Sequence, residues 1–161
     1  MNRRTTAPPT AAPLDDIDRM LLAALAEDAR ASVAELAKHI GLSAPSTSER
    51  LRRLEAQGVI GGYTVQIDPR ALGYTLQAIV RVKPLPGKLH IVQQLLDSIP
   101  EFTECDRVTG DDCFVARLQV RSIEQLDQIL DRIVDRAETS TAIVKSQPIR
   151  RRPPPLMSAS E

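Results

Sequence analysis

The sequence predicts an α+β chain of two small domains, a helical one followed by one of strands and helices. Apolar residues recur at helical spacing up to about residue 60 and alternate after about residue 75. Asp68-Pro69 and Gly73 interrupt the pattern between these regions. With 161 residues the chain can hold two small domains. We therefore expect a first domain over residues 14–62, a linker strand over 63–74 and a second domain over 75–149.

Composition and charge exclude several classes of protein. Trp is absent and only two Phe and two Tyr are present, so the core must be aliphatic. No apolar run reaches the roughly 20 residues of a spanning helix, and the first residues do not resemble a secretory signal. We therefore expect a cytoplasmic protein, without contact to a membrane, in which Cys105 and Cys113 are unpaired thiols. Because 21 basic residues balance 21 acidic ones, bulk charge gives no support to nucleic-acid binding.

Both ends of the chain resemble tails. Residues 1–13 are rich in Thr, Ala and Pro, and residues 150–161 are basic, then Pro-rich, then polar. Such segments are expected to be disordered or loosely docked. Arg150, Arg151 and Arg152 indicate a solvated tail, although phosphate contacts or binding of a partner subunit are alternatives.

The first domain begins with three helices. Asp15 announces the first helix, and Ser32 with Glu35 forms a capping box at the start of the second. Gly41 ends the second helix as a left-handed cap, and Ser43 caps a third helix with Pro45 in its first turn. The pattern is that of a helix, a tight turn and a helix.

The third helix has an inner and an outer face. Thr47, Leu51 and Leu54 form its inner face, and the helix ends at Gly58. The outer face is polar, with Arg52 on its flank. Residues 59–67 alternate and predict a short hairpin or wing, which completes a winged helix-turn-helix.

The second helix of a helix-turn-helix enters the major groove of DNA. Arginine suits bidentate contact with guanine or phosphate, and small residues at the helix start let the backbone approach the duplex. The alternative is an ordinary solvated face. The outer face of the third helix is expected to be free in solvent. Replacing Arg50 or Arg53 with Ala should therefore weaken DNA binding by roughly 1–3 kcal/mol and leave the fold intact. The expected DNA-binding residues are Ser43, Ala44, Ser46, Thr47, Glu49, Arg50 and Arg53.

The second domain predicts the order βαββαβ, the ferredoxin-like arrangement. A strand over 76–82 precedes a helix over 89–99, which Pro100 ends. A hairpin over 102–120 turns at Gly110, a helix follows Ser122, and a last strand covers 141–145. Helices would cover one sheet face only, leaving Ile79, Cys113 and Val115 on the other. That face predicts dimerisation, and two recognition helices about a two-fold axis predict a palindromic DNA site.

One edge of this sheet is a candidate site for a small zwitterion. With right-handed crossovers, the loop over 83–88, the turn over 109–112 and the loop over 137–141 share that edge. Backbone N–H groups at the turn and hydroxyls of the loop can bind a carboxylate, while Asp111 or Asp112 can hold an ammonium. The alternative is two ordinary turns. The expected effector-binding residues are Thr109, Gly110, Asp111, Asp112, Thr139, Ser140 and Thr141.

Four sequence motifs of the chain resemble those of a known family. It contains D-x-x-D-x-x-L-L from Asp15, L-A-x-x-x-G-L-S from Leu36, R-x-x-x-L-E-x-x-G-V-I from Arg50 and the run VTGDDCFVARLQV. These motifs are similar to those of the Lrp/AsnC (feast/famine) transcriptional regulators, over nearly everything except the two tails. The resemblance implies sequence-specific binding of double-stranded DNA through residues 43–55 and a ferredoxin-like domain of the RAM type. It also implies homodimers that associate into tetramers or octamers, and control by an amino acid or related metabolite near the hairpin.

The sequence departs from the family after the hairpin glycine. The commoner family pattern has an acid followed by Tyr there, where this chain has Cys113-Phe114. The change removes a carboxylate and a hydroxyl from the expected effector site. Recognition of the leucine type is therefore not assumed.

Two other classes of function fit parts of this pattern. Sirohaem decarboxylases resemble the same two-domain architecture, but such an enzyme needs a proton donor, and this chain offers only His39 and His90. No nucleophile motif, glycine-rich phosphate loop or metal-ligand spacing is present, so we expect no enzyme, no catalytic residue, no metal and no cofactor. The third alternative is an interaction module that no longer binds DNA, against which Arg50 and Arg53 count.

Overall fold

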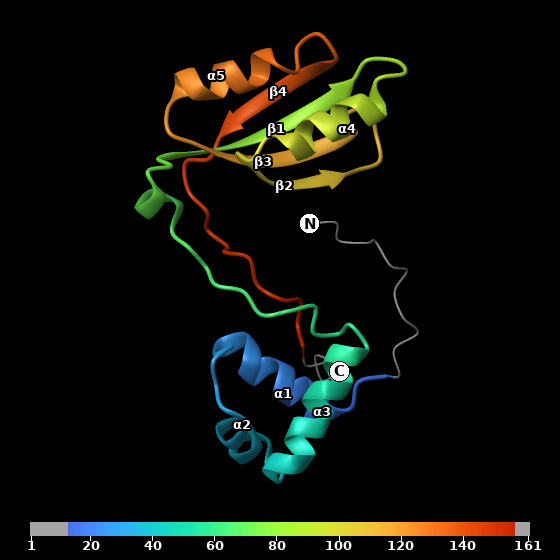
Figure 1. The fold of residues 1–161 in the computed structure, drawn as a ribbon, viewed down its shortest axis with the longest axis vertical. Coiled ribbons are helices and arrows are strands. Elements are labelled where there is room, and N and C mark those ends of the chain that lie inside the picture. The colour runs from blue at the N-terminus through green and yellow to red at the C-terminus, as the bar shows by residue number, and fades with distance from the viewer. Residues whose placement is uncertain (1–12, 157–161) are drawn as a thin grey trace. The chain divides into compact units, whose positions relative to one another are not determined.

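The computed structural model describes residues 13–156 and has two compact units (Figure 1). One unit comprises residues 66–150, and the other comprises the chain on both sides of it. The expected tail over residues 1–13 lies outside the described residues except for Pro13, as do residues 157–161 of the C-terminal tail. The predicted α+β class is confirmed.

The first unit contains α1 (Asp16–Glu27), α2 (Val33–Ile40) and α3 (Ala44–Ala56). Local chemistry places each helix end as expected. Both α1 and α2 start with a capping box, Asp15 with Asp18 and Ser32 with Glu35. Gly41 ends α2 at a φ of 70°, which lets the chain turn at once into α3. The unit packs around a buried cluster of Leu21, Leu36, Ile40 and Leu54.

The predicted hairpin over residues 59–67 and the linker strand over 63–74 do not form. Residues 61–68 have no regular structure, and Tyr63, Val65 and Ile67 are exposed. A short 3₁₀ helix, η1 (Pro69–Leu72), follows and ends at Gly73. Alternation predicts an extended chain, but a strand also needs a neighbour that accepts its hydrogen bonds, and this segment pairs with none in the described chain.

The second unit is a four-stranded antiparallel sheet with strand order β2-β3-β1-β4. Its elements are β1 (Leu76–Pro84), α4 (Leu89–Ser98), β2 (Phe102–Arg107), β3 (Phe114–Val120), α5 (Ile123–Asp131) and β4 (Ala137–Ile143). Alternate residues of β1 and β3 share one buried cluster with residues of α4 and α5, so both helices cover the same sheet face. The predicted βαββαβ order and ferredoxin-like arrangement are confirmed.

Two boundaries differ from the prediction by four residues or more. The last strand begins at Ala137 rather than Thr141, and α5 ends at Asp131 rather than reaching Ala137. Ile133 and Ala137 are buried in the core cluster, so their apolar spacing is real. A turn at residues 132–136 places them there, because helical spacing of two buried residues also fits a turn that enters a strand. Among the described residues, no helix is long and apolar enough to cross a membrane.

Candidate functional site

The start of α3 presents small polar groups to solvent. Ser43 caps the helix and accepts a hydrogen bond from the backbone N–H of Ser46, and the two hydroxyls lie 2.9 Å apart. Ser43, Ala44, Ser46 and Glu49 are all exposed. An exposed helix start with short side chains lets the backbone of α3 approach a large partner closely.

Thr47 belongs to the core and not to this surface. It is fully buried, and its hydroxyl donates to the carbonyl of Ser43 at 2.9 Å. The expectation that Thr47 contacts DNA is therefore wrong. Its position on the inner face, beside Leu54, decides its burial, and the hydroxyl serves the first turn of the helix instead.

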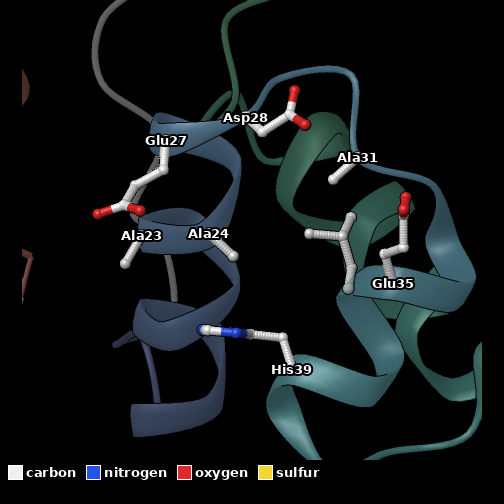
Figure 2. A pocket seen from close by; sticks show the side chains of 8 residues that line it. Ala23, Ala24, Glu27, Asp28, Ala31, Glu35 and His39 are labelled. Carbon is white, nitrogen blue, oxygen red and sulfur yellow. The ribbon is translucent and has the colours of Figure 1, made fainter.

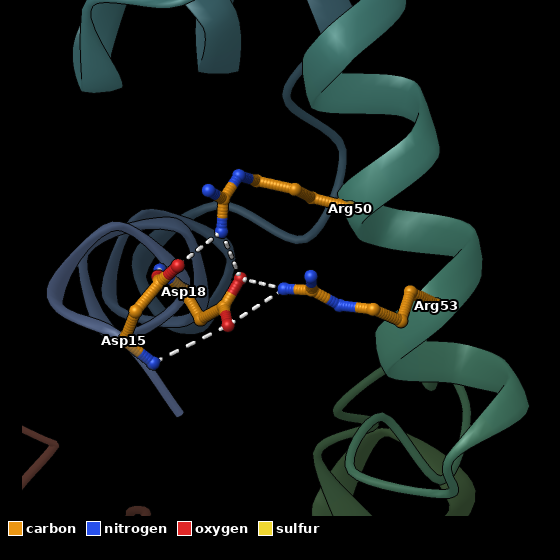
Figure 3. A network of polar contacts seen from close by, with 4 residues as sticks. All are labelled: Asp15, Asp18, Arg50 and Arg53. Atoms are coloured by element: carbon orange, nitrogen blue, oxygen red, sulfur yellow. Dashed lines mark hydrogen bonds and ion pairs between the residues drawn. The ribbon is translucent and has the colours of Figure 1, made fainter. Parts of the chain in front are cut away.

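Arg50 and Arg53 are held by two acids of the first helix (Figure 3). Nη1 of Arg50 donates to Asp15 Oδ2 at 2.7 Å and to Asp18 Oδ1 at 2.8 Å. Nη2 of Arg53 donates to both carboxylate oxygens of Asp18, at 2.7 and 2.8 Å. The side chain of Arg50 is only 22% exposed. The expectation that both arginines stand free in solvent is therefore wrong, because each is ion-paired, although the side chain of Arg53 is still 45% exposed.

Asp18 is the centre of this network. It is 3% exposed, and besides the two guanidinium groups it accepts a longer bond from the backbone N–H of Asp15. A buried carboxylate is stable only with such partners, because burial removes its water. The four residues thus tie α3 to the start of α1, and this fixes the direction in which the outer face of α3 points.

The network shifts the protonation equilibria of its members. Hydrogen bonds from Arg50 and from the backbone of Asp18 hold the pKa of Asp15 below its ordinary value. Hydrogen bonds to the carboxylates of Asp15 and Asp18 raise the pKa of Arg50. Asp15 and Arg50 therefore stay ionised through the neutral range.

Sequence reasoning missed three residues of this surface. The sequence pattern identifies Asp15 only as the start of the first helix and gives no contact for Asp18, although the i, i+3 spacing of the two acids matches that of Arg50 and Arg53. Arg52 was placed on a flank of α3, but it is exposed, and no hydrogen bond or ion pair in the described chain holds its guanidinium. Among the arginines of α3, Arg52 is thus the one whose whole guanidinium group is available to a partner in the described chain.

The structure brings the expected loops of the second unit to one sheet edge. The start of β3 at Phe114 lies opposite Arg107 of β2 and Val82 of β1, and the end of β1 at Pro84 lies opposite Ala137 of β4. The turn over 109–112 and the start of β4 therefore share this edge. Since β1 lies between β3 and β4, two strand spacings, about 10 Å, separate the two groups.

The three hydroxyl residues lie in strand β4 and not in a loop. Thr139 and Thr141 stand opposite Val82 and Val80, which point into the core, while Ser140 stands opposite Arg81 on the other face. All three are exposed. The sheet thus divides the expected effector residues between two faces, with Thr139 and Thr141 together on the helix-covered side.

The uncovered sheet face is mixed rather than apolar. Ile79 and Val115 lie on it, together with Arg81 and Arg117. Cys113 precedes β3 and packs against the core cluster, so its expected place on this face is wrong. Side chains alternate between the two sheet faces only within a strand, and β3 begins at Phe114, one residue after Cys113.

A hollow of about 300 Å³ lies between α1 and α2 (Figure 2). Two of its acids already have partners, because Asp28 accepts from the backbone of Arg30 and Glu35 from Ser32. His39 points across it toward α1. The described residues contain no group of three His, Cys, Asp or Glu side chains that could hold a metal ion. The lining residues are Ala23, Ala24, Glu27, Asp28, Ala31, Glu35, Leu36 and His39.

Comparison with known proteins matches both units. Winged helix-turn-helix DNA-binding domains match residues 14–60, and the Lrp/AsnC ligand binding domain matches residues 77–154. The HTH-type transcriptional regulator LrpA of Mycobacterium tuberculosis is 40% identical over 80% of this chain and 86% of that protein.

Solved structures agree over most of the chain. The structure of LrpC from Bacillus subtilis aligns with a TM-score of 0.82 at 28% identity, over 87% of this chain and all of that one. A feast or famine regulatory protein from Mycobacterium tuberculosis, complexed with L-methionine, aligns with a TM-score of 0.79 at 37% identity, over 86% of this chain and 96% of that one.

Proposed function

This chain belongs to the Lrp/AsnC family of DNA-binding transcriptional regulators and carries its ligand-binding domain, and we propose that it binds palindromic operators as a homo-oligomer controlled by an amino acid or related metabolite. The relatives are named transcriptional regulators, which favours this function over the enzyme alternative. The DNA partner also favours a location in the cytoplasm.

The exposed face of α3 carries the DNA-binding proposal. Ser43, Ser46, Glu49 and Arg52 present hydroxyls, a carboxylate and a guanidinium to solvent on one helix. Carboxylates accept from cytosine, guanidinium groups donate to guanine or phosphate, and serine hydroxyls reach either. Arg50 and Arg53 contribute by holding α3 in place, and their remaining N–H groups can also face the duplex.

The second unit supports oligomerisation and effector binding. Its sheet has helices on one face only, so the face with Ile79 and Val115 is available to a second copy of the chain. At the edge of the sheet, Gly110 opens the turn with a φ of 114°, and the turn places Asp111 and Asp112 near the strand start. The L-methionine bound to the relative from Mycobacterium tuberculosis supports an amino acid as the class of ligand.

Selection of duplexes from a random pool by the full-length protein tests this function. We expect enrichment of a palindromic sequence, and a change in affinity or in sedimentation when the right amino acid is added. Ser46→Ala and Glu49→Gln should alter the selected sequence, whereas Glu27→Gln, an exposed charge change on α1, should not. If no sequence is enriched, or if both α3 variants select the wild-type sequence, the assignment of α3 to DNA is overturned.

A further inference from the structure

The C-terminal segment of the chain docks on the helical unit. Residues 151–156 pack with that unit and not with the sheet unit that they follow. Nη1 of Arg19, on α1, donates to the carbonyl of Leu156 at 3.0 Å. Leu156 is half-buried, while residues 150–155 are exposed. The segment is therefore anchored at its far end, and the residues before the anchor remain accessible.

The anchor lies beside the network that holds α3. Arg19 directly follows Asp18, whose carboxylate binds Arg50 and Arg53 of α3. Three consecutive prolines, residues 153–155, separate the anchor from the basic residues. Because each proline fixes its own φ, they limit how far the arginines can move from α1.

The three helices of the helical unit, taken without residues 1–13, carry more acidic than basic side chains. Residues 14–62 contain eight acidic and six basic side chains, a net charge of −2. Two of those six bases, Arg50 and Arg53, are already bound to Asp15 and Asp18. Affinity for a duplex comes largely from cations placed near phosphates, and in this part of the unit the acidic side chains outnumber the basic ones.

Arg150, Arg151 and Arg152 supply the missing charge. Together with residues 14–62 they change the net charge from −2 to +1. All three are exposed, and an arginine side chain spans several ångströms and donates to phosphate in a forked geometry. The segment thus brings a compact group of cations to a domain that has to approach a polyanion.

We propose that residues 150–156 form a phosphate-binding arm, anchored to α1 through Arg19 and Leu156, which contacts the backbone of the same duplex that α3 binds. The proposal rests on the proposed DNA-binding function and adds a contact outside the helix-turn-helix. The arm provides affinity without sequence information, and α3 provides the sequence preference.

The salt dependence of binding tests the arm. The probe is a random-sequence duplex of about 40 base pairs, titrated with the full-length protein at several salt concentrations. The slope of log K against log salt is negative, and each lost phosphate contact makes it shallower by about 0.9. A variant with Arg150→Ala, Arg151→Ala and Arg152→Ala should therefore reduce the magnitude of the slope by about 2 to 3. The matched control removes three exposed arginines from the sheet unit, through Arg70→Ala, Arg107→Ala and Arg132→Ala, and should leave the slope unchanged.

A second readout separates direct contact from a distant effect of charge. Trypsin cleaves after Arg150 and Arg151, so a saturating amount of duplex should protect these two bonds in the wild type. The arm proposal is overturned if the arm variant has the same salt slope as the wild type. It is also overturned if the slope becomes shallower but the duplex does not protect the bonds after Arg150 and Arg151 from trypsin. In both cases DNA binding by α3 stands. Absence of binding by the wild type at any salt concentration overturns the proposed function itself, and the arm with it.

Discussion

Nη2 of Arg53 lies 2.7 Å from Oδ1 of Asp18, a carboxylate that is almost fully buried at the start of α1. The contact joins α3 to α1 through two residues that are 35 positions apart in the sequence. With the bonds of Arg50 to Asp15 and Asp18, it shows that these two arginines help to set the geometry of the helical unit.

Asp18→Asn should destabilise the helical unit by about 2 to 3 kcal/mol. Asparagine keeps the shape of the side chain, but two guanidinium groups lose their buried counter-charge. Hydrogen exchange of the α1 and α3 amides measures the change in this unit alone. Asp16→Asn, on an exposed neighbouring position, is the matched control and should stay within about 0.5 kcal/mol of wild type.

Asp15→Asn should reduce the amount by which the free energy of unfolding falls between pH 7 and about pH 3. The folded pKa of Asp15 lies below its ordinary value of 3.8, first through its hydrogen bond with Arg50. This stabilisation is therefore complete above about pH 4 and is lost as the pH falls through the lower folded pKa. Asparagine still caps α1, so urea unfolding at pH 7 and near pH 3 isolates the charge. Equal acid sensitivity of variant and wild type contradicts the prediction.

Arg52→Ala and Arg50→Ala should have different effects. Arg52 is exposed, so its loss should weaken binding to a selected operator by about 1–3 kcal/mol and change stability by less than about 0.5 kcal/mol. Arg50 bonds Asp15 and Asp18, so its loss should also lower stability by about 1–2 kcal/mol. Titration of the operator, paired with urea unfolding, checks both quantities. Equal stability loss in the two variants contradicts the different roles.

Gly73→Ala should destabilise the sheet unit by about 2 kcal/mol. Gly73 has a φ of +84°, and an added Cβ would lie 2.7 Å from Nη1 of Arg121, whose guanidinium stacks over the ring of Tyr74. Gly87→Ala is the control, because its φ is +77° but a Cβ there meets nothing within 4 Å. Gly87→Ala should therefore show the backbone cost alone, about 1 kcal/mol. Urea unfolding of both variants tests the difference, and equal losses show that Arg121 yields without cost.

Gly110→Val combined with Thr141→Ala should abolish amino-acid binding. Valine does not tolerate the φ of 114° at the turn, and the second change removes the hydroxyl of Thr141 from the helix-covered face of β4. Calorimetric titration of the twenty amino acids against wild type and this variant measures the effect. Thr103→Ala, on the exposed part of β2, serves as the control and should bind like wild type. No binding to wild type, or equal binding to the double variant, contradicts the proposed effector edge.

Local signals in the sequence determined the helices and their ends. Ser32 with Glu35, Gly41 and Ser43 act through hydrogen bonds and φ angles within a few residues, so their effect can be predicted without the rest of the chain. The period-two pattern of β1 and β3 likewise fixed which residues enter the core, because side chains of a strand alternate strictly. These signals were sufficient for the α+β class and the order of elements.

Tertiary structure decided which polar side chains are free. Helical spacing placed Arg50, Arg53 and Arg52 on or near one outer face, but only the approach of α1 shows that Asp15 and Asp18 bind the first two. The absence of the predicted linker strand over residues 63–74 has the same origin, since a strand depends on a neighbour and not on its own pattern. The anchoring of Leu156 by Arg19 joins residues 137 positions apart, a distance at which sequence pattern carries no information about contact.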